Sequence, residues 1–86
     1  QRQTEMPEKS YTTQLFNSGT SRIAQKVAEE ASEVAIAAAS GDRESLPSEV
    51  SDLLYHTLVL LADTGLSPEA VWKELRNRRA QHKPTT

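Results

Sequence analysis

The fold is decided by the stretch from Ser21 to Gly65, SRIAQKVAEEASEVAIAAASGDRESLPSEVSDLLYHTLVLLADTG. In its first half, apolar residues recur at helical spacing until Gly41, and in its second half a run of leucines follows a first-turn proline. The stretch therefore predicts two long helices, at about residues 20–40 and 46–64, joined by a short polar loop. The apolar stripe of the first helix consists of Ile23, Val27, Val34 and Ala38.

Shorter helices are predicted on both sides of this pair. Ser10 is a plausible N-cap for a helix through Phe16, and Ser67-Pro68 begins another whose apolar positions include Trp72. No segment alternates apolar and polar residues as a strand would. We therefore expect an all-α bundle of four to five helices, with neighbouring long helices antiparallel. The expected organisation is a flexible lead-in at 1–9, a helical domain at 10–81 and a polar tail at 82–86.

Size and composition limit the classes of protein. With 86 residues and no cysteine, the chain can bury only a modest core and has no disulfide, so completion by dimerisation is the default expectation. The lack of cysteine suits a reducing compartment, and we expect a cytoplasmic protein. No apolar run approaches the roughly 20 residues of a membrane span, so no membrane partner is expected.

Charge is distributed unevenly along the chain. The net charge of −2 is too small to indicate a nucleic-acid partner. Acids dominate the centre of the sequence, which suits a cation, and bases crowd its end. Those bases either form a solvated helix end, favoured by the helix dipole, or approach phosphates. They are Lys73, Arg76, Arg78, Arg79 and Lys83.

Two carboxylate pairs, Glu30-x-x-Glu33 and Glu49-x-x-Asp52, give the clearest chemical signal. Residues three apart lie on one face of a helix, so both pairs can converge if the two long helices pack side by side. Hard cations such as Mg²⁺ prefer oxygen ligands of this kind. The pattern favours a magnesium site, while the alternative is that these are ordinary helix acids and first-turn acids.

Three neighbours of these carboxylates have open roles. Lys26 precedes Glu30 by one turn, so it can form an ion pair with Glu30 or contact a phosphate. His56 follows Asp52 by one turn and is interpreted as a packed, hydrogen-bonded residue rather than a base or ligand. Tyr55 is interpreted as a packing residue.

Several segments in this order resemble a known family. They are Ser10-Tyr11-Thr12, Gly19, IAQKVAEEASE at 23–33, EVSDLLYH at 49–56 and LVLL at 58–61. Their order and spacing, over about residues 10–80, resemble the phosphoribosyl-ATP pyrophosphohydrolases of histidine biosynthesis. That family is similar to the MazG-type and dimeric dUTPase enzymes, which share E-E-x-x-E followed by E-x-x-D. One departure is Ala28, where the family commonly has glycine.

The resemblance implies Mg²⁺-dependent hydrolysis of phosphoribosyl-ATP to phosphoribosyl-AMP and pyrophosphate by a homodimer. It implies that Mg²⁺ is held by Glu30, Glu33, Glu49 and Asp52. It further implies that Glu29 and Glu30 are catalytic, with Glu29 orienting the attacking water, and that Lys26 binds the substrate.

The resemblance leaves other readings open. The family also occurs fused behind a phosphoribosyl-AMP cyclohydrolase domain, and a chain that begins with Gln1 is expected to be processed or excised from something longer, with Met6 as an alternative start. A house-cleaning nucleoside triphosphate pyrophosphohydrolase would use the same carboxylates. A non-enzymatic helical interaction module would not need Mg²⁺.

Overall fold

The computed structural model describes the backbone of residues 2–81 and the side chains of residues 10–80. The described residues form four helices and no strand: α1 (Arg2–Ser18), α2 (Thr20–Ala39), α3 (Leu46–Asp63) and α4 (Pro68–Gln81). The all-α prediction is confirmed, and so are the two central helices to within a residue or two. The predicted tail at 82–86 lies outside the described residues.

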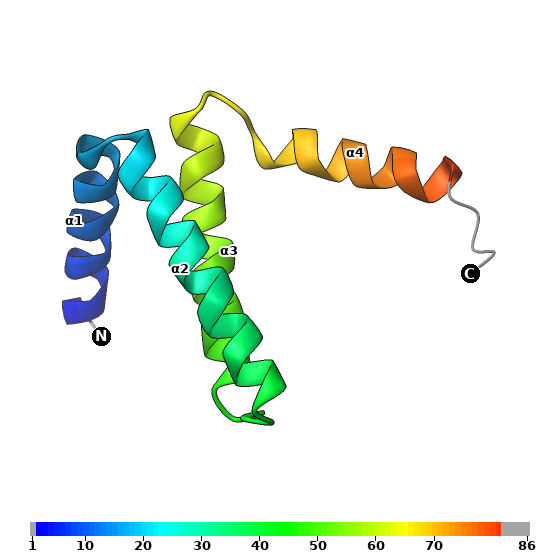
Figure 1. Cartoon of the computed structure of the whole chain (residues 1–86). Helices are drawn as coiled ribbons and strands as arrows, with labels where there is room; N and C mark the ends of the chain where they lie inside the picture. The colour runs from blue at the N-terminus through cyan, green and yellow to red at the C-terminus, as the bar shows by residue number, and fades with distance from the viewer. Residues whose placement is uncertain (1, 82–86) are drawn as a thin grey trace.

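α2 and α3 form an antiparallel pair, with α1 packed against one end of it (Figure 1). A three-residue centre made by Leu15, Ile23 and Val59, one from each of these helices, holds them together. Ile23 is fully buried. The side chain of Thr20 also donates a hydrogen bond to Asp63, which ties the start of α2 to the end of α3. These contacts fix which faces of α2 and α3 meet.

A single glycine sets the direction of α1. Gly19 separates α1 from α2 and has φ 95° and ψ 161°, a combination that is essentially restricted to glycine. The sharp change of direction at this residue brings the C-terminal half of α1 back over the α2–α3 pair. Tyr11 consequently packs against the central cluster.

The predicted start of the first helix at Ser10 is wrong, because α1 begins at Arg2 and continues through Pro7. The segment before Ser10 is polar, so it carries no apolar periodicity from which a helix could be recognised. It is nevertheless rich in glutamine, glutamate, methionine and lysine, which favour helix. The proposed boundary between residues 9 and 10 stays a prediction, although α1 runs across it.

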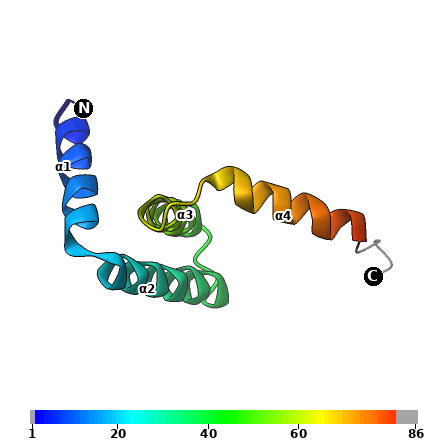
Figure 2. The same cartoon turned by 90° about the horizontal axis from the view of Figure 1, so that it is seen from above.

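The prediction that the helix at 46–64 is buried on most sides is also wrong for a single chain. Leu54 is 56% exposed and Leu58 is 43% exposed, because among the described helices it is α1 and α2 that pack against α3. The C-terminal helix α4 points away from the other three (Figures 1 and 2). Its apolar residues, among them Trp72 and Leu75, are therefore exposed. Within the described residues, no helix is both long and apolar enough to cross a bilayer.

Candidate active site

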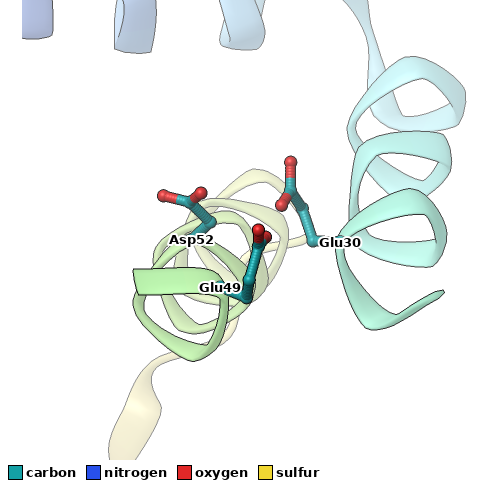
Figure 3. A group of neighbouring side chains, drawn as sticks. All are labelled: Glu30, Glu49 and Asp52. Atoms are coloured by element: carbon teal, nitrogen blue, oxygen red, sulfur yellow. The ribbon is translucent and has the colours of Figure 1, made fainter. Parts of the chain in front are cut away.

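Carboxylates from α2 and α3 converge where the two helices pack (Figure 3). One oxygen each from Glu30, Glu49 and Asp52 lies within 4.8 Å of the other two. Glu30 comes from α2, whereas Glu49 and Asp52 occupy successive turns at the start of α3. Glu30 and Glu49 are half-buried and Asp52 is exposed. We call these three residues the carboxylate triad; its donor atoms are of the kind that a divalent hard cation prefers.

Partial burial raises the pKa of the Glu49 carboxyl above its ordinary value. The negative charges of Glu33, Asp52 and Glu30, together with a hydrogen bond to Glu33, raise this pKa further. Each of these causes disfavours the charged form of Glu49. A bound cation would reverse the balance, since it would attract all of these carboxylates.

Glu33 and Glu29 lie beside the triad rather than in it. Glu33 is hydrogen-bonded to Glu49, and both line an open hollow of about 410 Å³ together with Glu29. Glu29 accepts a hydrogen bond from Gln25 at 3.1 Å. The roles predicted for Glu33 as a ligand and for Glu29 as a catalytic residue stay predictions.

Lys26 is positioned for both of its predicted roles. Its Nζ lies 3.9 Å from a carboxylate oxygen of Glu29 and 3.9 Å from one of Glu30. It also lines two hollows on the other side of the triad. An ammonium group at this place both offsets the negative charge of the triad and faces the space that a ligand would occupy.

The larger of these two hollows, which we call the triad hollow, has a volume of about 440 Å³. Such a volume is typical of small-molecule sites, which span roughly 300–1,000 Å³. The triad hollow joins α1 to the carboxylates of α2 and α3. Its lining includes Tyr11, Lys26, Glu30, Asp52, Tyr55 and His56.

His56 and Tyr11 form a hydrogen-bonded chain in the wall of the triad hollow. His56 is only 5% exposed; its Nδ1 lies 2.8 Å from the backbone oxygen of Asp52, and its Nε2 lies 2.7 Å from the Tyr11 hydroxyl. A carbonyl oxygen can only accept, so in neutral His56 the proton is assigned to Nδ1 and Tyr11 donates to Nε2. The prediction that His56 is a packed, hydrogen-bonded residue is confirmed.

Tyr55 packs as predicted and also faces the triad hollow. Its ring stacks on Tyr11 with centroids 6.1 Å apart, and its hydroxyl is hydrogen-bonded to Thr12. Sequence reasoning assigned no role to Tyr11. A tyrosine that directly follows a predicted N-cap, Ser10, gives no local sign that it will contact a residue 45 positions away in the sequence.

Comparison with known proteins agrees with this geometry. Residues 1–79 match the family described as PRA-PH, phosphoribosyl-ATP pyrophosphohydrolase. The chain belongs to the phosphoribosyl-ATP pyrophosphohydrolase family. This confirms the resemblance inferred from the motifs. Ala28 stands where the family commonly has glycine. Its side chain is exposed, so the added methyl group lies at the surface.

Among the relatives in this family is the phosphoribosyl-ATP pyrophosphatase of Azospirillum brasilense, 57% identical over 72 residues. The match covers 84% of this chain and 65% of that protein. The protein of the same name from Zymomonas mobilis is also 57% identical, with 67% of its length covered. The histidine biosynthesis bifunctional protein HisIE of Shewanella oneidensis is 52% identical over 95% of this chain, but only 40% of that protein is covered. The chain thus spans about two thirds or less of these relatives.

Replacing Glu49 with Gln should stabilise the folded chain at neutral pH in the absence of metal ions, because the substitution removes one of several mutually repelling carboxylates. The folded-state pKa of Glu49 lies above its ordinary value of 4.5, so the folded state holds the proton more tightly than the unfolded state. The contribution of Glu49 to stability therefore falls as the pH rises from about 4.5 through the raised pKa.

This prediction is checked by thermal melts of wild type, Glu49→Gln and Glu44→Gln in chelator across pH 4 to 8. Glu44 is an exposed loop residue outside the triad. The melting temperature of Glu49→Gln should exceed that of wild type at pH 7, and the difference should shrink towards pH 4. An equal gain in Glu44→Gln would contradict the assignment to local repulsion.

Proposed function

We propose that this chain hydrolyses phosphoribosyl-ATP to phosphoribosyl-AMP and pyrophosphate, a step of histidine biosynthesis that implies a cytoplasmic enzyme. The observation that carries the proposal is the convergence of Glu30, Glu49 and Asp52 within 4.8 Å, in a chain whose family is named for this reaction. Lys26 and the triad hollow adjoin the carboxylates and offer space and positive charge for a phosphorylated ligand.

Magnesium is the cofactor that fits these residues best. The triad offers only oxygen donors, and the described chain brings them together despite the repulsion that raises the pKa of Glu49. We propose that Glu30, Glu49 and Asp52 hold the ion, with Glu33 as a further ligand beside Glu49. When bound, Mg²⁺ would neutralise phosphate charge and favour departure of the pyrophosphate.

The reaction balances as a hydrolysis. An oxygen of water bonds to the α-phosphorus, and the bond from that phosphorus to the oxygen bridging to the β-phosphate breaks. The bridging oxygen leaves with the pyrophosphate, and the water gives up a proton. Glu29 and Glu30 are the carboxylates proposed to orient this water, and Lys26 is proposed to contact the phosphates.

Pyrophosphate release from phosphoribosyl-ATP, measured beside ATP and dUTP with Mg²⁺ or with chelator, tests this function. We expect turnover of phosphoribosyl-ATP that requires Mg²⁺. Glu30→Gln and Glu49→Gln should each lower kcat/KM by at least about 100-fold, because they weaken charge stabilisation worth several kcal/mol. Glu44→Gln is the matched control and should retain wild-type activity.

Other outcomes of this assay would redirect the assignment. Turnover of ATP or dUTP without phosphoribosyl-ATP would indicate a house-cleaning pyrophosphohydrolase. Turnover that persists in Glu30→Gln with unchanged kcat/KM would contradict the assigned ligands. Absence of any Mg²⁺-dependent reaction would favour a helical interaction module.

A homodimer is part of the proposal. A compact 9.5 kDa protein exposes about 5,000 Å², whereas this chain exposes 6601 Å². Large apolar side chains contribute to that surface on α2, α3 and α4. They include Ile36, Leu54, Leu58, Trp72 and Leu75, and Leu66 in the loop between α3 and α4 is exposed as well. A second copy of the chain would cover these faces in the way that the family resemblance implies.

Sedimentation equilibrium of wild type, Trp72→Ala and Lys73→Ala tests the dimer. Wild type should sediment with twice the mass of the chain. The dimer of Trp72→Ala should have a higher dissociation constant than the wild-type dimer, because the substitution removes a large apolar side chain that is 48% exposed in the single chain. Lys73→Ala changes a neighbouring exposed charge and should behave as wild type. A wild-type chain that sediments as a monomer would contradict the proposal.

The partner implied by a bifunctional arrangement also stays a proposal. The relative from Shewanella oneidensis is named as bifunctional and is covered by this chain over 40% of its length. A phosphoribosyl-AMP cyclohydrolase unit, joined to this domain or acting after it, would consume the proposed product.

A further inference from the structure

A second, smaller hollow adjoins the triad hollow. We call it the basic hollow; it has a volume of about 200 Å³ and lies between α1 and the first turns of α2. Tyr11 and Lys26 line both hollows, so the two meet at these residues. The remaining lining of the basic hollow is Gln14, Leu15, Ser18 and Arg22.

The two hollows differ in charge. The triad hollow contains the carboxylates of Glu30 and Asp52, whereas the side chains of residues 10–80 that line the basic hollow include Arg22 and Lys26 and no carboxylate. Lys26 is already shared with Glu29 and Glu30. No ion pair with Arg22 is formed by the side chains of residues 10–80. The basic hollow is therefore suited to an anion, with Arg22 as its main positive group.

The hydrogen-bond donors of the basic hollow can be assigned. The Tyr11 hydroxyl proton is directed to His56, and the Ser18 hydroxyl donates to the backbone oxygen of Leu15 at 2.8 Å. The protons of both hydroxyls are thus already used in hydrogen bonds within the protein. Among the described side chains, the donors that remain for an anion are the guanidinium of Arg22, the ammonium of Lys26 and the amide of Gln14. A guanidinium with its fork of N–H groups matches the geometry of a phosphate.

Arg22, Lys26 and Glu30 follow one another at intervals of four residues along one face of α2. Each interval advances about 6 Å along the helix axis, so Arg22 lies about 12 Å along the axis from the triad residue Glu30. Lys26 is near enough to serve the phosphates held at the triad. Arg22 is placed for a negative group farther along the same ligand.

Phosphoribosyl-ATP carries such a group. Its three linked phosphates lie close together, whereas the 5-phosphate of the added ribose is separated from them by the base and two sugars. We propose that Arg22, assisted by Gln14, binds this 5-phosphate and so selects phosphoribosyl-ATP over ordinary nucleoside triphosphates. The inference rests on the proposed function, and it assigns to the basic hollow the phosphate that the reaction does not touch.

The test uses the whole chain with three substitutions, Arg22→Gln, Arg22→Lys and Arg43→Gln. Arg43 is an exposed arginine in the loop between α2 and α3 and controls for loss of one positive charge. Arg22→Gln should raise KM for phosphoribosyl-ATP by roughly 10- to 100-fold, as expected for lost hydrogen bonds to a charged group. Its kcat should change little, because the contact is equally present before and during the reaction. Arg22→Lys should recover part of the loss.

Binding measurements show which phosphate group of the substrate occupies the basic hollow, and they do not depend on turnover. Ribose 5-phosphate and pyrophosphate are titrated into each protein by NMR. In Arg22→Gln, affinity for ribose 5-phosphate should fall while affinity for pyrophosphate is kept. Loss of pyrophosphate affinity alone would assign the basic hollow to the leaving group and overturn the proposal, as would unchanged affinity for both.

Failure of the proposed function gives a different pattern. A wild-type chain that binds ribose 5-phosphate through Arg22 but does not turn over phosphoribosyl-ATP would leave the 5-phosphate subsite supported and the reaction refuted. A wild-type chain that turns over phosphoribosyl-ATP with the same KM in Arg22→Gln would keep the reaction and refute the subsite.

Discussion

The site depends on negative charges that repel one another and are nevertheless held together. Glu30 on α2 faces Glu49 and Asp52 on α3, and Glu33 is hydrogen-bonded to Glu49. Partial burial and this repulsion raise the pKa of Glu49, and the repulsion also opposes close packing of the two helices at this place. The apolar contacts of Ile23 and Val59, farther along the same pair, hold the helices at a fixed spacing. The apolar contacts therefore fix the place of these carboxylates, whose oxygen atoms are donors of the kind that a divalent hard cation prefers.

The helix α1 forms one wall of the site. Gly19 permits the turn that returns α1 over α2 and α3. Tyr11 then donates to His56, and His56 donates to the backbone oxygen of Asp52. This chain of hydrogen bonds links α1 to the turn that carries a triad residue. It also uses the hydroxyl proton of Tyr11, so among the described side chains Arg22 and Lys26 are the charged donors that line the basic hollow.

Much of this arrangement could be predicted from sequence because it is local. Apolar spacing, Gly41 and Pro47 were sufficient to place α2 and α3, and the three-residue spacing of the carboxylates placed Glu49 and Asp52 on one face. The resemblance to the family is carried by those same segments. The start of α1 was missed because its residues are mostly polar and show no apolar periodicity, so helix propensity is the main signal they give.

Other features depend on contacts between distant segments. Tyr11 reaches His56 only because Gly19 turns the chain, and Arg22 acquires significance only when α1 forms the other wall of the basic hollow. The exposure of Leu54 and Leu58 could not be predicted either, since a leucine-rich helix has the same sequence whether its own chain or a second copy covers it.

The role proposed for the carboxylate triad is to hold a divalent cation. Its most direct test is anomalous diffraction from crystals of the chain grown with Mn²⁺ in place of Mg²⁺. An anomalous peak is expected within coordination distance of Glu30, Glu49 and Asp52, and no peak is expected at this place in Glu49→Gln. A well-ordered triad with no peak in wild type, or Mn²⁺ bound only elsewhere on the chain, would contradict this role.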